Sequence, residues 1–170
     1  MTRKIFKVAK STAILFSIAV FIISYIFQIV TVSGESMIPT MQSNDKLLLQ
    51  KVSNRLECVK KNDIVVIKYP ANISKRIVKR VIAVARDKVK INNNILYING
   101  QIINENYKNE SFMKDYDEAL VPQDSIFVLG DNRNYSKDSR SSDIGFVKLN
   151  LLEEKVLIRL YPFNKMGRIR

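Results

Sequence analysis

The chain divides into two parts by its pattern of apolar and polar positions. Residues 11–32 carry no charge over a span of roughly 20 residues, the length that an α-helix needs to cross a hydrocarbon core. This run is apolar all round rather than along one stripe, which argues against a helix of a soluble core. After it, helical periodicity is scarce and short β-branched runs dominate. The pattern therefore predicts a single N-terminal transmembrane helix followed by strands.

The expected strands are separated by turn-forming residues. Asn99 and Gly100 form a two-residue turn signal, and Pro70 ends another run. The expected strands are 46–52, 63–69, 76–84, 88–91, 95–98, 101–103, 125–129 and 156–161. Residues 104–120 are polar and acidic with little pattern, so we expect a short surface excursion there. Many short strands of this kind indicate a mainly β, antiparallel domain.

The charges beside the apolar run predict its orientation. Arg3, Lys4, Lys7 and Lys10 precede it, and such a basic flank favours the cytoplasmic side. We therefore expect residues 1–10 in the cytoplasm, 11–32 as a single-pass anchor in the cell membrane, and 33–170 outside it. A cleavable signal peptide is the alternative, but the run is longer than the usual apolar region and no Ala-x-Ala cleavage pattern follows it.

Composition excludes several classes of site. The chain has no histidine and one cysteine, Cys58, so a Ser-His-Asp triad is excluded and a structural zinc site is disfavoured. Cys58 has no histidine partner and lies in a charged stretch, so we expect a structural role for it. The net charge of +12 suits nucleic acid or an anionic membrane. Because the chain carries an anchor and no recognition-helix motif, we expect a membrane and no nucleic acid as its partner.

Without histidine, a serine nucleophile needs another group to take its proton. A lysine kept neutral by burial can do so. Ser36 lies between Gly34 and Pro39, which favour a tight loop that presents a hydroxyl and leaves a backbone N–H free for an oxyanion. In the expected strand 76–84, Lys79 shares a mostly apolar face. From the residues alone, other lysines of this region are equally good candidates for the base.

Three separated segments resemble the boxes of type I signal peptidases, particularly the short Gram-positive form. They are SMIPTM at 36–41, VKRVI at 78–82 and GDNRNYSKDSR at 130–140. The resemblance implies the signal-peptidase and LexA-like Ser-Lys protease fold, with an antiparallel β-sheet catalytic domain. It also implies a catalytic Ser-Lys dyad of Ser36 and Lys79, and it selects Lys79 over Lys68 and Lys75.

The third segment implies further roles. The family places a serine near the lysine ammonium, which corresponds to Ser136, and a hydrogen bond from there could orient Lys79. Asp138 and Arg140 correspond to a structural ion pair behind the site, and Asp131 to a second structural support. The Asp-x-Arg spacing puts Asp138 and Arg140 on one side of an extended segment, close enough for a bidentate contact.

The chain departs from the family pattern at two places. Position 34 is glycine, as in the Gram-positive form. Some other members of the family have a serine at this position, which supplies a second oxyanion donor. The backbone N–H of Ser36 is therefore the one donor that we assign. Residues 83–87 read AVARD where the family has a Gly-Leu-Pro-Gly-Asp turn. Met37 and Ile38 are expected to contact substrate or the lipid interface, or else to lie in the core.

The resemblance implies a membrane-bound serine endopeptidase. Its substrates would be secretory preproteins, from which it cleaves the N-terminal signal peptide after small residues of the Ala-x-Ala type, without metal or cofactor. One alternative is a specialised or non-catalytic relative that binds exported or pilus proteins. A self-cleaving Ser-Lys regulator of the repressor type is a second alternative, against which the anchor and the lack of a DNA-binding segment argue.

Overall fold

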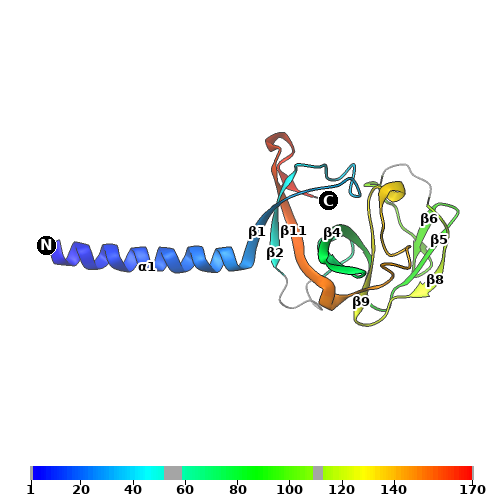
Figure 1. The fold of residues 1–170 in the computed structure, drawn as a ribbon, viewed down its shortest axis with the longest axis horizontal. Helices are drawn as coiled ribbons and strands as arrows, with labels where there is room; N and C mark the ends of the chain where they lie inside the picture. The colour runs from blue at the N-terminus through cyan, green and yellow to red at the C-terminus, as the bar shows by residue number, and fades with distance from the viewer. Residues whose placement is uncertain (1, 52–58, 109–112, 170) are drawn as a thin grey trace.

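A computed structural model describes residues 2–51, 59–108 and 113–169, so Cys58 lies outside the described residues. The chain begins with helix α1 (Thr2–Ile26), which projects away from the β-sheets as a single rod (Figure 1). Among the described residues, no helix combines the length and the apolar character that a membrane crossing requires.

The apolar run does not stay helical to its end. Helix α1 stops at Ile26, and strand β1 (Phe27–Thr31) follows directly and pairs antiparallel with β2 (Lys46–Lys51). The expectation of a helix through residue 32 is therefore wrong over its last residues. Ile29, Val30 and Thr31 are β-branched, which favours strand, and pairing with β2 satisfies their backbone groups.

The larger sheet carries the segments of interest. Its other strands are β3 (Ile64–Tyr69), β4 (Asn72–Ala83), β9 (Ser125–Leu129), β10 (Val147–Lys148), β11 (Leu152–Tyr161) and β12 (Gly167–Arg168). The strand order is β1-β2-β11-β3-β4-β9-β10, with β12 on β11, and all these pairs are antiparallel. Strand β4 pairs with β3 along most of its length but with β9 only from Arg80 to Ala83. In the part of the chain that the structure describes, the segment of β4 before Arg80 thus has one unpaired edge.

A second, four-stranded sheet packs on the side away from α1 (Figure 1). It consists of β5 (Lys88–Asn92), β6 (Ile95–Ile98), β7 (Gln101–Ile102) and β8 (Tyr116–Leu120), in the order β7-β6-β5-β8. Buried side chains of β5 and β6 form one core cluster with Phe127 of β9 and with Met113. The residues that the structure describes also form three short 3-10 helices, at Arg133–Tyr135, Leu149–Leu151 and Phe163–Lys165.

The mainly antiparallel β fold expected from the sequence is confirmed, but the segment 104–120 differs from expectation. It contributes strand β8 to the smaller sheet, and it buries Glu105 and Met113 completely or nearly so. Its acidic residues Asp117 and Glu118 are exposed. Those solvent-facing charges obscure the strand pattern, which is why this segment looked like an excursion in the sequence.

Candidate active site

The Ser36 loop is held at two points. The segment 34–40 leaves the sheet after β1, and Gly34 has φ of +102°, a conformation open mainly to glycine. The backbone N–H and C=O of Gly34 both bond the Ser43 hydroxyl, at 3.2 Å each. At the other side, the backbone N–H of Asn132 donates to the Ser36 carbonyl at 3.1 Å. The half-buried Ser36 is therefore docked directly against the segment that follows β9.

Lys79 lies on β4 and is 3% exposed. Burial lowers the pKa of its ammonium from 10.5 to about 8, because desolvation outweighs the attraction of Asp138. The rival lysines differ. The Lys68 side chain is 40% exposed and 3.5 Å from Glu153, and Lys75 is exposed beside the Tyr69 ring. Burial thus separates Lys79 from Lys68 and Lys75.

Ser36 and Lys79 line the same groove, which has a volume of about 750 Å³. Its walls include residues of β1 and the segment 75–79 of β4, and its floor includes Leu49 and Val66. The groove therefore combines an apolar floor with charged side chains at its sides, among them Lys75, Arg76 and Glu35. A groove walled by strands suits an extended chain, which can pair its backbone with them.

Gly130 brings Ser36 and Ser136 together. A Cβ atom at Gly130 would lie 2.2 Å from the Ser136 hydroxyl oxygen and 2.5 Å from the Ser36 carbonyl oxygen, so only glycine fits. The Ser136 hydroxyl is buried and has no hydrogen-bond partner among the residues that the structure describes. The hydrogen bond expected between Ser136 and Lys79 is therefore not formed. A buried, unpaired hydroxyl costs about 1–3 kcal/mol and leaves an acceptor available beside the site.

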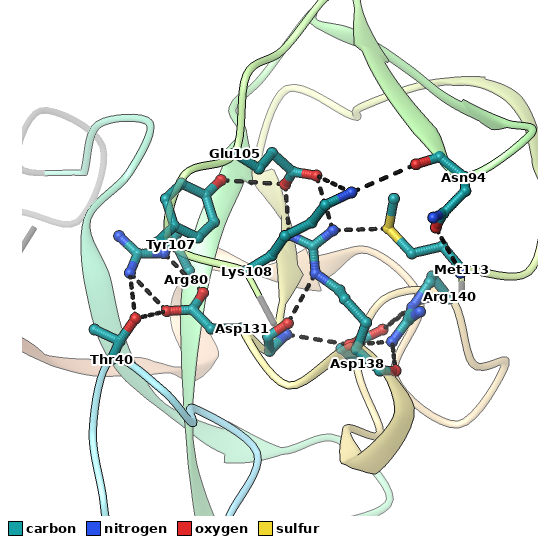
Figure 2. A network of polar contacts seen from close by, with 12 residues as sticks. Thr40, Arg80, Asn94, Glu105, Tyr107, Lys108, Met113, Asp131, Asp138 and Arg140 are labelled. Carbon is teal, nitrogen blue, oxygen red and sulfur yellow. Dashed lines mark hydrogen bonds and ion pairs between the residues drawn. The ribbon is translucent and has the colours of Figure 1, made fainter. Parts of the chain in front are cut away.

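Asp131 supports the site through a fully buried ion pair. Its carboxylate accepts two hydrogen bonds from the Arg80 guanidinium, at 2.8 and 2.6 Å, and a third from the Thr40 hydroxyl (Figure 2). The Arg80 guanidinium also stacks 3.9 Å from the centre of the Tyr107 ring. Thr40 belongs to the Ser36 loop and Arg80 follows Lys79, so Asp131 ties both elements together.

The expected contact between Asp138 and Arg140 is present. Arg140 donates from Nε and Nη2 to the two carboxylate oxygens of Asp138, at 2.8 Å each. Asp138 also accepts the backbone N–H of Gly130 at 3.1 Å. This pair therefore fixes the turn on which Gly130 and Ser136 meet.

Comparison with known proteins identifies the family of this chain. Residues 5–161 match the family model described as "Signal peptidase, peptidase S26". The chain belongs to this family. It is 36% identical over 157 residues to Signal peptidase I of Bacillus caldolyticus, covering 84% of each chain. It is 32% identical over 183 residues to Signal peptidase IB of Staphylococcus aureus (strain COL), covering 97% of this chain and 94% of that one.

A solved structure of the family agrees. The crystal structure of a signal peptidase I from Enterococcus faecalis V583 matches with a TM-score of 0.52 and 33% identity. The match covers 60% of this chain and 98% of that chain.

One buried contact in this member of the signal peptidase family was not predicted from the sequence. Glu105, 7% exposed, makes a two-pronged ion pair with Arg133, which is 2% exposed. Arg133 in turn donates from Nε to the Gly130 carbonyl at 3.0 Å. Figure 2 shows Glu105, Tyr107 and Lys108 converging in this network. The segment 104–108 thus braces the loop that carries Ser136.

The structure also distinguishes Met37 from Ile38. Met37 is 3% exposed, packs in a core cluster with Leu47 and Leu49, and lines the groove. It is therefore a core residue with one face on the groove. Ile38 is half-buried and does not line the groove. Contact of Met37 and Ile38 with substrate or lipid stays a prediction.

Proposed function

We propose that this chain is a membrane-attached signal peptidase that cleaves N-terminal signal peptides from exported preproteins by a Ser36–Lys79 dyad. The observation that carries the proposal is the burial of Lys79 in the groove that Ser36 also lines. With a pKa of about 8, about one-tenth of the Lys79 side chains are neutral at pH 7, against fewer than about one in a thousand for an ordinary lysine. A neutral amine is the form that can accept a proton from serine.

The substrate binds as an added strand. The segment of β4 before Arg80 has an unpaired edge, and β1 is the outermost strand at its end of the sheet. Both strands line the groove. A preprotein in extended conformation can therefore pair its backbone with these edges while alternate side chains point down to the floor. Small side chains at P1 and P3 fit this arrangement.

In the first half of the reaction, Ser36 Oγ attacks the P1 carbonyl carbon and its proton passes to the Lys79 Nζ. The negative charge that develops on the carbonyl oxygen is stabilised by the backbone N–H of Ser36. The intermediate then collapses, the scissile C–N bond breaks, and Lys79 returns the proton to the leaving amine. The mature protein departs, and the signal peptide remains esterified to Ser36.

In the second half, a water molecule attacks the ester carbonyl while Lys79 takes its proton. The ester bond breaks, the proton returns to Ser36 Oγ, and the signal peptide leaves with a new carboxylate. Lys79 carries a positive charge each time it has accepted a proton. The unpaired Ser136 hydroxyl near Ser36 can accept a hydrogen bond from that ammonium, which gives Ser136 an orienting role in the reaction even though the bond is absent at rest.

Cleavage is expected to depend on pH through Lys79. Because the base must be neutral, the logarithm of kcat/KM should rise with unit slope from pH 6 toward a bend near 8 and level off above it. The measurement is the initial rate of preprotein cleavage across this range in detergent micelles with phospholipid. A rate that is flat from pH 6 to 9, or falls, would contradict Lys79 as the base.

Helix α1 attaches the protein to the membrane. Its apolar side chains are exposed in the structure, among them Leu15, Phe16 and Phe21, at 65 to 72%. Lipid is the cover that matches such an apolar surface, and the basic N-terminal residues favour a cytoplasmic start and an external sheet domain.

Protease added outside intact cells should therefore digest the sheet domain. Protection of that domain until the cells are lysed would overturn this topology.

A further inference from the structure

The floor of the groove contains a carboxylate. In the sheet order β1-β2-β11-β3-β4, the two outer strands form the walls of the groove and the three inner strands lie between them. The inner strands contribute Leu47 and Leu49 from β2, Val66 from β3 and Glu154 from β11. Glu154 therefore sits on the central strand of an apolar floor, two strands away from either wall.

Glu154 makes no direct polar contact within the described part of the chain. It is 7% exposed, and its carboxylate makes neither a hydrogen bond nor an ion pair with any described residue. The neighbouring Glu153 engages Arg76 and Lys68. Lys51, opposite Glu154 on β2, has an exposed side chain that forms no ion pair with it. Burial, reinforced by the charge of Glu153, raises the pKa of the Glu154 carboxyl. Because Glu154 lines the groove, its carboxylate can pair with a cation that a ligand brings there.

We propose that Glu154 forms an acidic subsite that accepts a lysine or arginine side chain at P3 of the substrate. The inference rests on the proposed function and deepens it. With P1 beside Ser36, the next side chain facing the floor is P3, because alternate residues of an extended chain share a face. Glu154 pairs in register with Val66, and Val66 with Val78 of β4, so two strand spacings of about 10 Å separate Glu154 from the wall. A lysine side chain and the Glu154 side chain together can bridge that gap.

The charges around the groove make Glu154 decisive for this selectivity. Lys75, Arg76, Lys79 and Lys137 all line it, against the acids Glu35 and Glu154. Without Glu154, a cation at P3 would enter a trough lined by like charges and find no carboxylate on its floor. Ala at P3 does not reach the floor carboxylate, so small residues remain accepted. The P3 pocket is therefore apolar for short side chains and acidic for long ones.

The test compares three preproteins that differ only at P3, which is Ala, Gln or Lys. Cleavage by the full chain is measured in detergent and phospholipid micelles for the wild type, Glu154→Gln and Glu153→Gln. Glu153→Gln removes a neighbouring charge that does not line the groove and is the matched control. Binding of the same three sequences, as fluorescent peptides, is measured on the Ser36→Ala protein with and without Glu154→Gln.

We expect Glu154→Gln to lower the Lys-to-Gln ratio of kcat/KM by about tenfold or more, with less than about twofold change for Ala. Glu153→Gln should leave the Lys-to-Gln ratio within about twofold. An equal loss on all three substrates, or the same ratio in both variants, would overturn the inference. If no protein cleaves any substrate, the proposed function fails. The ratio of Lys-peptide to Gln-peptide binding then still tests the subsite. A preference for the Lys peptide that Glu154→Gln removes supports the subsite, and the absence of such a preference refutes it.

Discussion

Replacing Lys79 with methionine is expected to reduce preprotein cleavage by about a thousandfold or more. Methionine fills a similar volume but cannot accept the Ser36 proton. Ser36→Ala should cause a loss of the same size, and the double variant should lose no more, because the two residues act in one step. Lys90→Met, at an exposed position on β5, should retain the wild-type rate within about twofold. Initial rates on one preprotein measure all four variants.

The same substitution should make the protein more stable, which separates lost chemistry from lost folding. The pKa of Lys79 is about 8 in the folded chain and near 10.5 when unfolded, so below pH 8 the folded state is destabilised by a buried, charged ammonium. This destabilisation is about 3 kcal/mol at 1.36 kcal/mol per pKa unit. It decreases as the pH rises from 8 to 10.5. Lys79→Met lacks it throughout.

Denaturant unfolding of the full chain in detergent therefore has a defined outcome. At pH 7 the free energy of unfolding of Lys79→Met should exceed that of the wild type by about 3 kcal/mol, and the two should converge toward pH 10.5. Cleavage that survives in a folded Lys79→Met protein would show that another group is the base. Equal stability of the two proteins at pH 7 would show that Lys79 is not desolvated as described.

Replacing Asp131 with asparagine is expected to lower the free energy of unfolding by about 3–5 kcal/mol. Asp131 is fully buried and accepts two hydrogen bonds from Arg80, so the substitution leaves a buried guanidinium without its counter-charge. The loss should be larger than that for an exposed pair. Glu118→Gln, which breaks the exposed Lys88–Glu118 pair, should cost less than about 1 kcal/mol.

A paired substitution tests the cause of the Asp131 effect. If the uncompensated charge of Arg80 is responsible, the combination Asp131→Leu with Arg80→Met should recover part of the lost stability, since both charges are removed together. Asp131→Asn and the double variant are compared by guanidinium unfolding, which is monitored by tyrosine fluorescence. No recovery in the double variant, or a cost for Asp131→Asn no greater than for Glu118→Gln, would show that the pair contributes little.

The segments with local patterns were predictable from the sequence. The alternation of residues 76–84 predicted the strand that carries Lys79, and the motif at 130–140 predicted the Asp138–Arg140 contact. Strand β1 was missed because its residues continue an apolar run, and short apolar runs do not distinguish helix from strand. Strand β8 was missed because its exposed acidic residues hide the alternation.

The missed side chains share another property, namely partners that are distant along the chain. Glu105 is buried against Arg133, which lies 28 residues away, and nothing near Glu105 in the sequence announces that contact. Glu154 lines the groove because β11 inserts between β2 and β3, and this strand order follows from the whole sheet. Pairing across a sheet depends on tertiary packing, which a local pattern does not contain.

The most direct test of the account is to incubate the wild-type chain with a preprotein carrying an Ala-x-Ala site and to determine the masses and new N-termini of the products. The account expects one cut, directly after the second Ala, with no cut by the Ser36→Ala protein. A folded wild-type protein that leaves several preproteins intact would contradict the account and favour a binding role, and a cut that Ser36→Ala still makes would contradict the proposed nucleophile.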